Sequence, residues 1–133
     1  MKVVVHVDGG ARGNPGPAAA AAVVHDADGR RLAEAGEALG VATNNVAEYR
    51  GLLLGLRLAR EQGATQVEVV NDSELVAKQV NGEYKVKHPD MKPLHAEAVQ
   101  ALAAFERWVV RSVPRAQNAE ADALVNRALD DAA

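Results

Sequence analysis

The sequence predicts a single mixed α/β domain, with a five-stranded sheet flanked by about four helices. Three observations favour this fold class. The chain has 133 residues, the size of one domain. Its N-terminal part contains three strand-like runs separated by turn residues, which predict an antiparallel meander. Helical and strand-like segments then alternate, which predicts two further strands that are joined by crossovers and run parallel to the first.

The meander is expected over residues 2–8, 18–25 and 31–39. The first run, KVVVHVD, is rich in β-branched residues and ends at Gly9-Gly10. The second run is mostly alanine, so it is predicted as a strand despite the weak β preference of that residue. The loop ARGNPGP precedes it, and Asp28-Gly29 is typical of the hairpin turn that follows it.

The first helix is expected over residues 46–62, after potential caps at 43–45. It has a stripe formed by Leu52, Leu53, Leu56 and Ala59 and stops at Gly63. The remaining elements are a strand (66–71), a helix (72–80), a loop (83–93), a helix (94–106), a strand (107–113) and a final helix (118–131).

Composition excludes several function classes. The chain is 48% hydrophobic and 25% charged, as in soluble globular proteins, and it has no cysteine for disulfides, thiol catalysis or cysteine-based metal sites. One Trp, two Tyr and one Phe are too few for a single-strand binder that stacks bases on aromatic rings. The longest apolar run, 18–24, is shorter than the about 18 residues of a membrane span. We therefore expect a cytoplasmic monomer with no membrane contact.

The net charge is −3, but the basic residues are unevenly distributed. Residues 76–115 carry 7 basic and 4 acidic side chains, whereas the segments on either side are both acidic. An ordinary solvated face explains such a bias, so charge alone does not indicate a nucleic-acid binder.

Four carboxylates are placed to meet at one end of the predicted sheet. Asp8 closes the first strand, Asp72 closes the fourth, Glu48 begins the helix between them, and Asp122 lies early in the last helix. Alone, each has a plain structural role. Asp8 can start a turn, and Asp72 can cap a helix. Glu48 can form a capping box with Asn45, and Asp122 is an acid near a helix N-terminus. Together they would repel one another unless cations lie between them, and carboxylates suit Mg²⁺ or Mn²⁺. Two such ions can activate water for phosphodiester hydrolysis.

Four motifs, in order along most of the chain, resemble those of the ribonuclease H type 1 family. They are DGGARGNPGP at 8–17, TNNVAE at 43–48, DS at 72–73 and NAEAD at 118–122. The resemblance implies the ribonuclease H-like fold and endonucleolytic cleavage of the RNA strand of an RNA–DNA hybrid, leaving 5′-phosphate and 3′-hydroxyl ends. It also implies that Asp8, Glu48, Asp72 and Asp122 hold two Mg²⁺ ions, for which Mn²⁺ is a possible substitute.

The resemblance further implies substrate contacts for polar residues near these carboxylates, and the glycines beside Asp8 are candidates on physical grounds. Amide and carboxylate groups can recognise a ribose 2′-hydroxyl, and glycines leave the backbone open to close approach. Helix capping is the plain alternative for Asn44 and Asn45. The resemblance implies substrate contacts for Glu48, Asn14, Asn44 and Asn45, and the open backbone predicts them for Gly9 and Gly10.

The sequence departs from the family in three places. The loop VPRAQN at 113–118 lacks the histidine that many members carry, and it resembles an actinobacterial subgroup with VPRxxN; we hypothesise that Arg115, or less favourably Gln117, contacts the substrate phosphate. The loop 83–93 is too short for a lysine-rich protrusion, which predicts weak, salt-sensitive hybrid binding. Glu74 stands where relatives often have Gln and is expected to point away from the substrate.

Two alternatives to this function remain open at this point. An exonuclease with the same fold would usually have Asp-x-Glu on its first strand, whereas Asp8 is followed here by two glycines. A non-catalytic binding module would usually lack one of the carboxylates. The sequence also leaves open whether the domain stands alone or belongs to a fusion, since some similar members carry a phosphatase-like domain.

Overall fold

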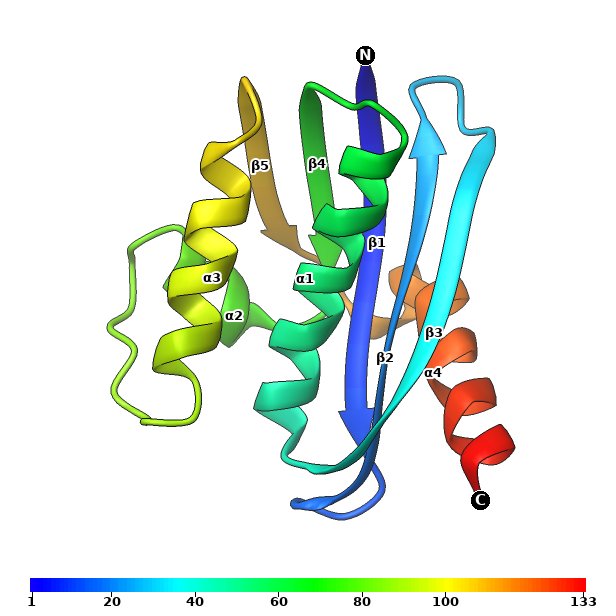
Figure 1. The fold of residues 1–133 in the computed structure, drawn as a ribbon, viewed down its shortest axis with the longest axis vertical. Helices are drawn as coiled ribbons and strands as arrows, with labels where there is room; N and C mark the ends of the chain where they lie inside the picture. The colour runs from blue at the N-terminus through cyan, green and yellow to red at the C-terminus, as the bar shows by residue number, and fades with distance from the viewer.

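The five strands form one sheet in the order β3-β2-β1-β4-β5 in a computed structural model that describes residues 1–133 (Figure 1). β1 pairs antiparallel with β2 and parallel with β4, which confirms the predicted mixed sheet. β2–β3 is antiparallel and β4–β5 parallel. The elements are β1 (Lys2–Ala11), β2 (Gly16–Asp26), β3 (Arg31–Ala42), α1 (Asn44–Glu61), β4 (Gln66–Asn71), α2 (Glu74–Val80), α3 (Lys92–Ala103), β5 (Arg107–Ser112), the 3₁₀ turn η1 (Arg115–Asn118) and α4 (Ala119–Ala132).

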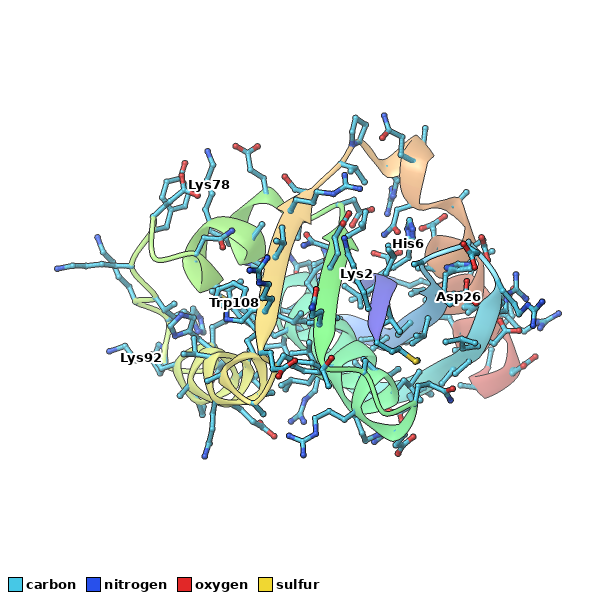
Figure 2. The ribbon with its side chains drawn as sticks, turned by 90° about the horizontal axis from the view of Figure 1, so that it is seen from above. Lys2, His6, Asp26, Lys78, Lys92 and Trp108 are labelled. Atoms are coloured by element: carbon cyan, nitrogen blue, oxygen red, sulfur yellow. The ribbon has the colours of Figure 1, made fainter.

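The helices lie on both faces of the sheet. α1 and α3 cover one face and α4 covers the other, as the two views show (Figures 1 and 2). The main core of 21 buried residues lies on the α1 and α3 side, whereas a small cluster of Ala19, Ala21, Val125 and Leu129 lies under α4. None of the helices has the length and continuous apolar character that crossing a membrane requires.

The alanine-rich strand β2 is explained by its place in the sheet. It lies between β1 and β3 and packs against α1 and α4. All five alanines from Ala18 to Ala22 are at most 2% exposed. Their small side chains let both helices approach closely, so burial between two layers outweighs the weak β preference of alanine.

Glycines set the close contact between α1 and β1. A Cβ added to Gly51 would overlap the carbonyl of Asp8, and one added to Gly9 would overlap the carbonyl of Ala47. A Cβ at Gly55 would lie 2.8 Å from a methyl group of Val5. This stripe of small residues, which the leucine spacing of α1 does not reveal, sets the distance between helix and sheet.

All three strands of the meander extend further than predicted, and β2 spans Gly16–Asp26 and not 18–25. β1 runs to Ala11 and not to Asp8, because the Gly9–Ala11 segment stays paired with β2. The expectation that Asp8 closes the strand is therefore wrong, although its parallel pairing with β4 does end at His6. β3 runs to Ala42 and not to 39, because a register shift beside Gly40, which has a φ of +73°, keeps the two strands paired.

Several helix boundaries also differ from the prediction. α1 starts two residues early, because Thr43 is its N-cap and accepts a hydrogen bond from the Val46 amide. α2 begins after Ser73, whose hydroxyl caps it, so Asp72 is not the N-cap. α3 spans Lys92–Ala103 and not 94–106, with Pro93 tolerated in its first turn. α4 begins at Ala119 after the unpredicted turn η1.

Candidate active site

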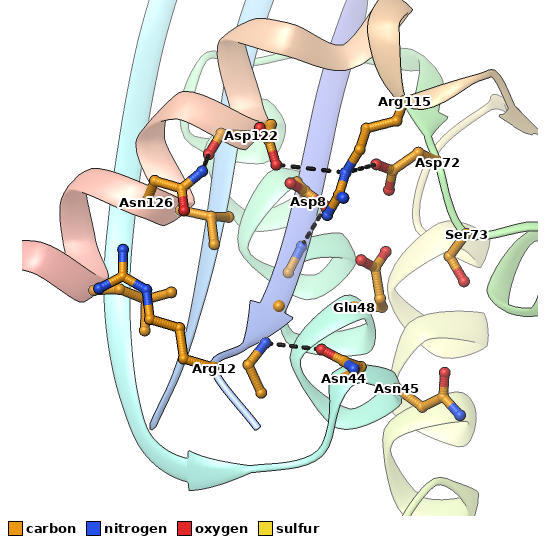
Figure 3. Close-up of a pocket in the computed structure, with 15 residues that line it drawn as sticks. Asp8, Arg12, Asn44, Asn45, Glu48, Asp72, Ser73, Arg115, Asp122 and Asn126 are labelled. Atoms are coloured by element: carbon orange, nitrogen blue, oxygen red, sulfur yellow. Dashed lines mark hydrogen bonds and ion pairs between the residues drawn. The ribbon is translucent and has the colours of Figure 1, made fainter. Parts of the chain in front are cut away.

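An open pocket of 590 Å³ lies beyond the paired ends of β1 and β4 (Figure 3). All four predicted carboxylates line it, on β1, on α1, after β4 and on α4. The other predicted residues that line it are Gly9, Gly10, Asn44, Asn45 and Arg115. Asn14 is the one predicted site residue that does not line the pocket.

Three of the carboxylates form a tight triad. One oxygen each from Asp8, Glu48 and Asp72 lies within 4.8 Å of the others. Asp8 and Asp72 meet because β1 and β4 are parallel neighbours. Glu48 joins them because Gly9 and Gly51 let α1 lie directly against β1. The capping-box role considered for Glu48 is wrong, since the cap of α1 is Thr43.

The triad carries a strong electrostatic penalty when all three groups are ionised. Burial, together with the Asp72 charge, raises the pKa of Asp8 to about 7. Burial and the charges of Asp8 and Asp72 raise the pKa of Glu48 to about 9. The amide of Gly9 offsets part of this by donating to Asp8 Oδ1 at 2.9 Å. Crowded, poorly solvated carboxylates are the environment in which a divalent cation binds strongly.

Asp122 joins the site from the opposite helix and is linked to Asp72 by Arg115. The Nε atom of Arg115 lies 3.8 Å from Asp72 Oδ2 and 3.7 Å from Asp122 Oδ1. Figure 3 shows the Arg115 side chain between these two carboxylates. The Arg115 side chain is 77% exposed, so these contacts are weak and solvent-screened. A guanidinium at this position balances part of the charge of the two acids.

A buried asparagine that the sequence analysis did not single out ties α4 to β1. Asn118 is 1% exposed, and its Nδ2 donates to the carbonyl of Val7 at 2.8 Å. Its Oδ1 lies 3.2 Å from His6 Nδ1. These contacts fix the start of α4 next to Asp8, and thereby place Asp122 at the pocket. His6 thus lies beside the site and contacts the asparagine that anchors α4.

The asparagines of the TNN motif and the glycine-rich loop hold each other in place. Asn44 Oδ1 accepts a hydrogen bond from the Ala11 amide at 2.8 Å. Asn14 Oδ1 accepts from the Asn44 amide at 3.0 Å. Helix capping by Asn44 and Asn45 is therefore not their role, since Thr43 caps α1. Asn45 is exposed at the pocket and free to meet a ligand.

Two further sequence expectations concern residues near the pocket. Glu74 does not line it; its carboxylate pairs with Lys78 Nζ at 2.6 Å, which confirms that it points elsewhere. Gly9 was expected to let the substrate approach the backbone. Its Cβ position is instead filled by the Ala47 carbonyl of α1, so glycine is required there for helix packing. Only Gly10 has open space on the pocket side, with Val125 as its nearest neighbour at 3.9 Å.

Some residues of the pocket were missed by the sequence analysis. Arg12 lies inside the glycine-rich motif but was treated only as part of a loop. Ser73 was noted only as part of a motif, and Asn126 gave no signal beyond helical spacing, because it lies one turn after Asp122. All three line the pocket.

Comparison with known proteins places this site in a family context. The family model described as reverse transcriptase-like matches residues 6–128. The bifunctional protein Rv2228c of Mycobacterium tuberculosis is 53% identical over all of this chain, and the chain spans 37% of that protein's length. Ribonuclease HI of Halobacterium salinarum is 44% identical, covering 98% of this chain and 66% of that protein.

Solved structures agree with these relationships. The N-terminal RNase H domain of Rv2228c, solved as a fusion with maltose-binding protein, has a TM-score of 0.96 and 52% identity, covering 99% of this chain and 96% of that one. LC11-RNase H1, solved in complex with an RNA/DNA hybrid, has a TM-score of 0.93 and 41% identity over 98% of each chain. The fold is therefore shared over nearly the whole length of the chain.

Proposed function

The chain belongs to the ribonuclease H family, and from this we propose that it hydrolyses the RNA strand of RNA–DNA hybrids at internal positions. The observation that carries the proposal is the triad of Asp8, Glu48 and Asp72, with oxygens within 4.8 Å of one another in an open pocket. Support also comes from LC11-RNase H1, a relative whose structure contains an RNA/DNA hybrid. The activity proposed here is that of residues 1–133 as a single domain.

The donor set of the pocket fits divalent metal ions. Carboxylate oxygens are hard ligands, which suit Mg²⁺ and Mn²⁺. The raised pKa values of Asp8 and Glu48 mark a site that lacks counter-charge, which a divalent cation would supply. We propose that the four acids Asp8, Glu48, Asp72 and Asp122 hold two Mg²⁺ ions, with Mn²⁺ as a substitute.

In this mechanism the protein orients the reacting groups and the metals supply the electrostatics. When held by Asp8, Glu48, Asp72 and Asp122, a pair of divalent ions would supply charge to activate a water and to stabilise the leaving 3′ oxygen, and the products would carry 5′-phosphate and 3′-hydroxyl ends. Asp8 and Asp72 are fixed by the pairing of β1 and β4, so their spacing is set by the sheet. Asp122 is positioned by α4, which Asn118 anchors to β1.

The walls of the pocket provide polar groups for the sugar and the backbone of the substrate. Asn44 and Asn45 line the side that faces away from Arg115 (Figure 3), and Gly10 also lines the pocket. Amide side chains here can accept from and donate to a 2′-hydroxyl, which distinguishes ribose from deoxyribose. Glu48 lines the same pocket and offers a further acceptor. We assign Arg115 to a phosphate near the cleaved bond, as the sequence suggests.

One gel separates this proposal from its alternatives. A hybrid with an end-labelled RNA strand is incubated with the protein in Mg²⁺, Mn²⁺ or EDTA. We expect internal cuts in the RNA with metal and no cuts in EDTA, with the DNA strand and a matched DNA duplex intact. Stepwise loss from one end indicates an exonuclease, and a shifted but uncut hybrid in every metal indicates a binding module.

A further inference from the structure

We propose that Arg12 binds a backbone phosphate of the hybrid at the rim of the pocket, and that Asp130 holds its guanidinium there until the substrate takes its place. This inference rests on the proposed function. The family resemblance assigns no role to Arg12, which forms an ion pair between the glycine-rich loop and Asp130 at the end of α4.

The structure places the Arg12 side chain between the pocket and α4. Arg12 lines the pocket, and its Nη2 lies 2.7 Å from Asp130 Oδ1. The backbone behind it is fixed, because the Arg12 amide donates to the Pro17 carbonyl at 2.8 Å. Gly16 packs directly against the Arg12 carbonyl, and a Cβ at this position would overlap it. A firmly held backbone carrying a long, half-exposed cation is suited to reach a ligand at the rim.

The charges of the pocket single out Arg12. The lining contains four carboxylates and two guanidinium groups, so a polyanion approaching it meets net negative charge. Arg115 lies between two of those carboxylates, Asp72 and Asp122. The partner of Arg12, in contrast, lies outside the pocket lining. Arg12 is therefore the basic residue of the lining that can bind a phosphate without leaving a carboxylate of the pocket unpaired.

The ion pair with Asp130 is of the kind that exchanges readily. The two side chains are 47% and 67% exposed, and exposed pairs contribute little to stability because water and salt screen them. A phosphate offers two oxygens to the planar guanidinium, which makes a stronger, charge-assisted contact. Exchange of Asp130 for phosphate is thus favourable, and Asp130 acts as a competitor that weakens binding while keeping the guanidinium near the rim.

The test measures hybrid affinity by fluorescence anisotropy in EDTA, in which no cutting occurs. Arg12→Gln should weaken binding by about three- to tenfold and lower the slope of log affinity against log salt by about 1, as for one lost phosphate contact. Asp130→Asn should act in the opposite direction and tighten binding by about two- to threefold, since the guanidinium no longer has a competing partner. In Mg²⁺, Arg12→Gln should raise KM and leave kcat within about twofold.

Asp131→Asn is the matched control for Asp130→Asn. It removes the same charge one residue along α4, where no ion pair with Asp131 is formed. Asp130→Asn must tighten binding more than this control does. In an Arg12→Gln background the two substitutions should have equal effects, because Asp130 is proposed to act through Arg12.

Two results overturn the inference. One is an unchanged affinity and salt slope in Arg12→Gln, with folding verified by circular dichroism. The other is a loss of affinity in Asp130→Asn, which would mean that the ion pair only supports the fold. The proposed function fails in a different way, namely if the wild-type protein neither binds nor cuts the hybrid.

Discussion

Replacing Asp8 by asparagine tests the electrostatic state of the carboxylate triad. Asp8 is 2% exposed and lies beside Glu48 and Asp72, and its Oδ1 accepts from the Gly9 amide. Asparagine keeps the shape and the acceptor oxygen but removes the charge. We expect the variant to lose cleavage entirely, because a metal ligand is lost, and yet to be more stable than the wild type in EDTA at pH 7.5.

The size of the gain follows from the pKa of Asp8. Burial, together with Asp72, raises this pKa from 3.8 to about 7, and each pKa unit is worth about 1.4 kcal/mol. At pH 7.5 ionised Asp8 therefore costs the folded state about 4 kcal/mol relative to the unfolded chain. The NH₂ group of the new asparagine is buried without a full set of acceptors, which costs the folded variant about 2 kcal/mol and offsets part of the gain. The net gain is about 2 kcal/mol, or about 7 °C in Tm for a chain of this length.

The sign of the pH dependence is a second check. A carboxyl group with a raised pKa binds more protons when folded than when unfolded, so the stability of the wild type falls as pH rises. For Asp8 the fall starts near pH 4 and levels off above about pH 7; for Glu48, whose pKa is raised to about 9, it continues further. The advantage of Asp8→Asn should therefore shrink towards zero by pH 5.

The assay is thermal unfolding followed by circular dichroism at pH 5 and pH 7.5, in EDTA and in excess Mg²⁺. Metal should stabilise the wild type and leave Asp8→Asn almost unchanged. Asp28→Asn is the control, since it removes a carboxylate at an exposed turn where Asn-Gly is equally suitable. A variant less stable than the wild type at pH 7.5, or an advantage independent of pH, would refute the electrostatic account.

Three other predictions follow from contacts in and around the pocket. Gly9→Ala should destabilise the protein by about 3 kcal/mol or more in chemical denaturation, because the new methyl group meets the Ala47 carbonyl, whereas Gly10→Ala should cost less than about 1 kcal/mol. Arg115→Ala should lower turnover in a steady-state cleavage assay and, because the Arg115 side chain is exposed and its contacts are long, change stability by less than about 1 kcal/mol; unchanged turnover and affinity would remove its assigned phosphate contact. Hybrid affinity measured from 50 to 200 mM salt should fall by about tenfold or more, and a flat profile would contradict binding through phosphates.

The sequence was sufficient for the topology because its signals were local. β-branched runs, the Asp28-Gly29 turn and leucine spacing in α1 predicted the antiparallel meander and the crossover to a parallel fourth strand, and these placed Asp8 beside Asp72. Strand ends were less predictable, since β1 continues past Asp8 only because its partner β2 continues alongside it. A local pattern carries no information about how far a neighbouring strand extends.

The supporting contacts of the site depend on residues that are distant in sequence. Asn118 donates to Val7 across 111 positions, and Tyr49 donates to Gln79 through a buried hydrogen bond of 2.6 Å. The identity of a polar residue, even within a motif such as NAEAD, gives no sign of such a partner. The contact of Gly9 with Ala47 is of the same kind, because a glycine pair in a loop-like motif is first explained by turn geometry.

The packing that brings the carboxylates together also makes their ionised forms less favourable. α1 is held on the sheet by Leu52, Leu56 and Tyr49, which are all at most 2% exposed, and this burial is favourable whatever the state of the acids. The same docking forces Glu48 towards Asp8 and raises the pKa of both groups. The apolar side of α1 must therefore outweigh the repulsion on its polar side. A cation bound between the acids removes this repulsion, so metal affinity and metal-free stability should change in opposite directions whenever the triad is altered without moving the helix.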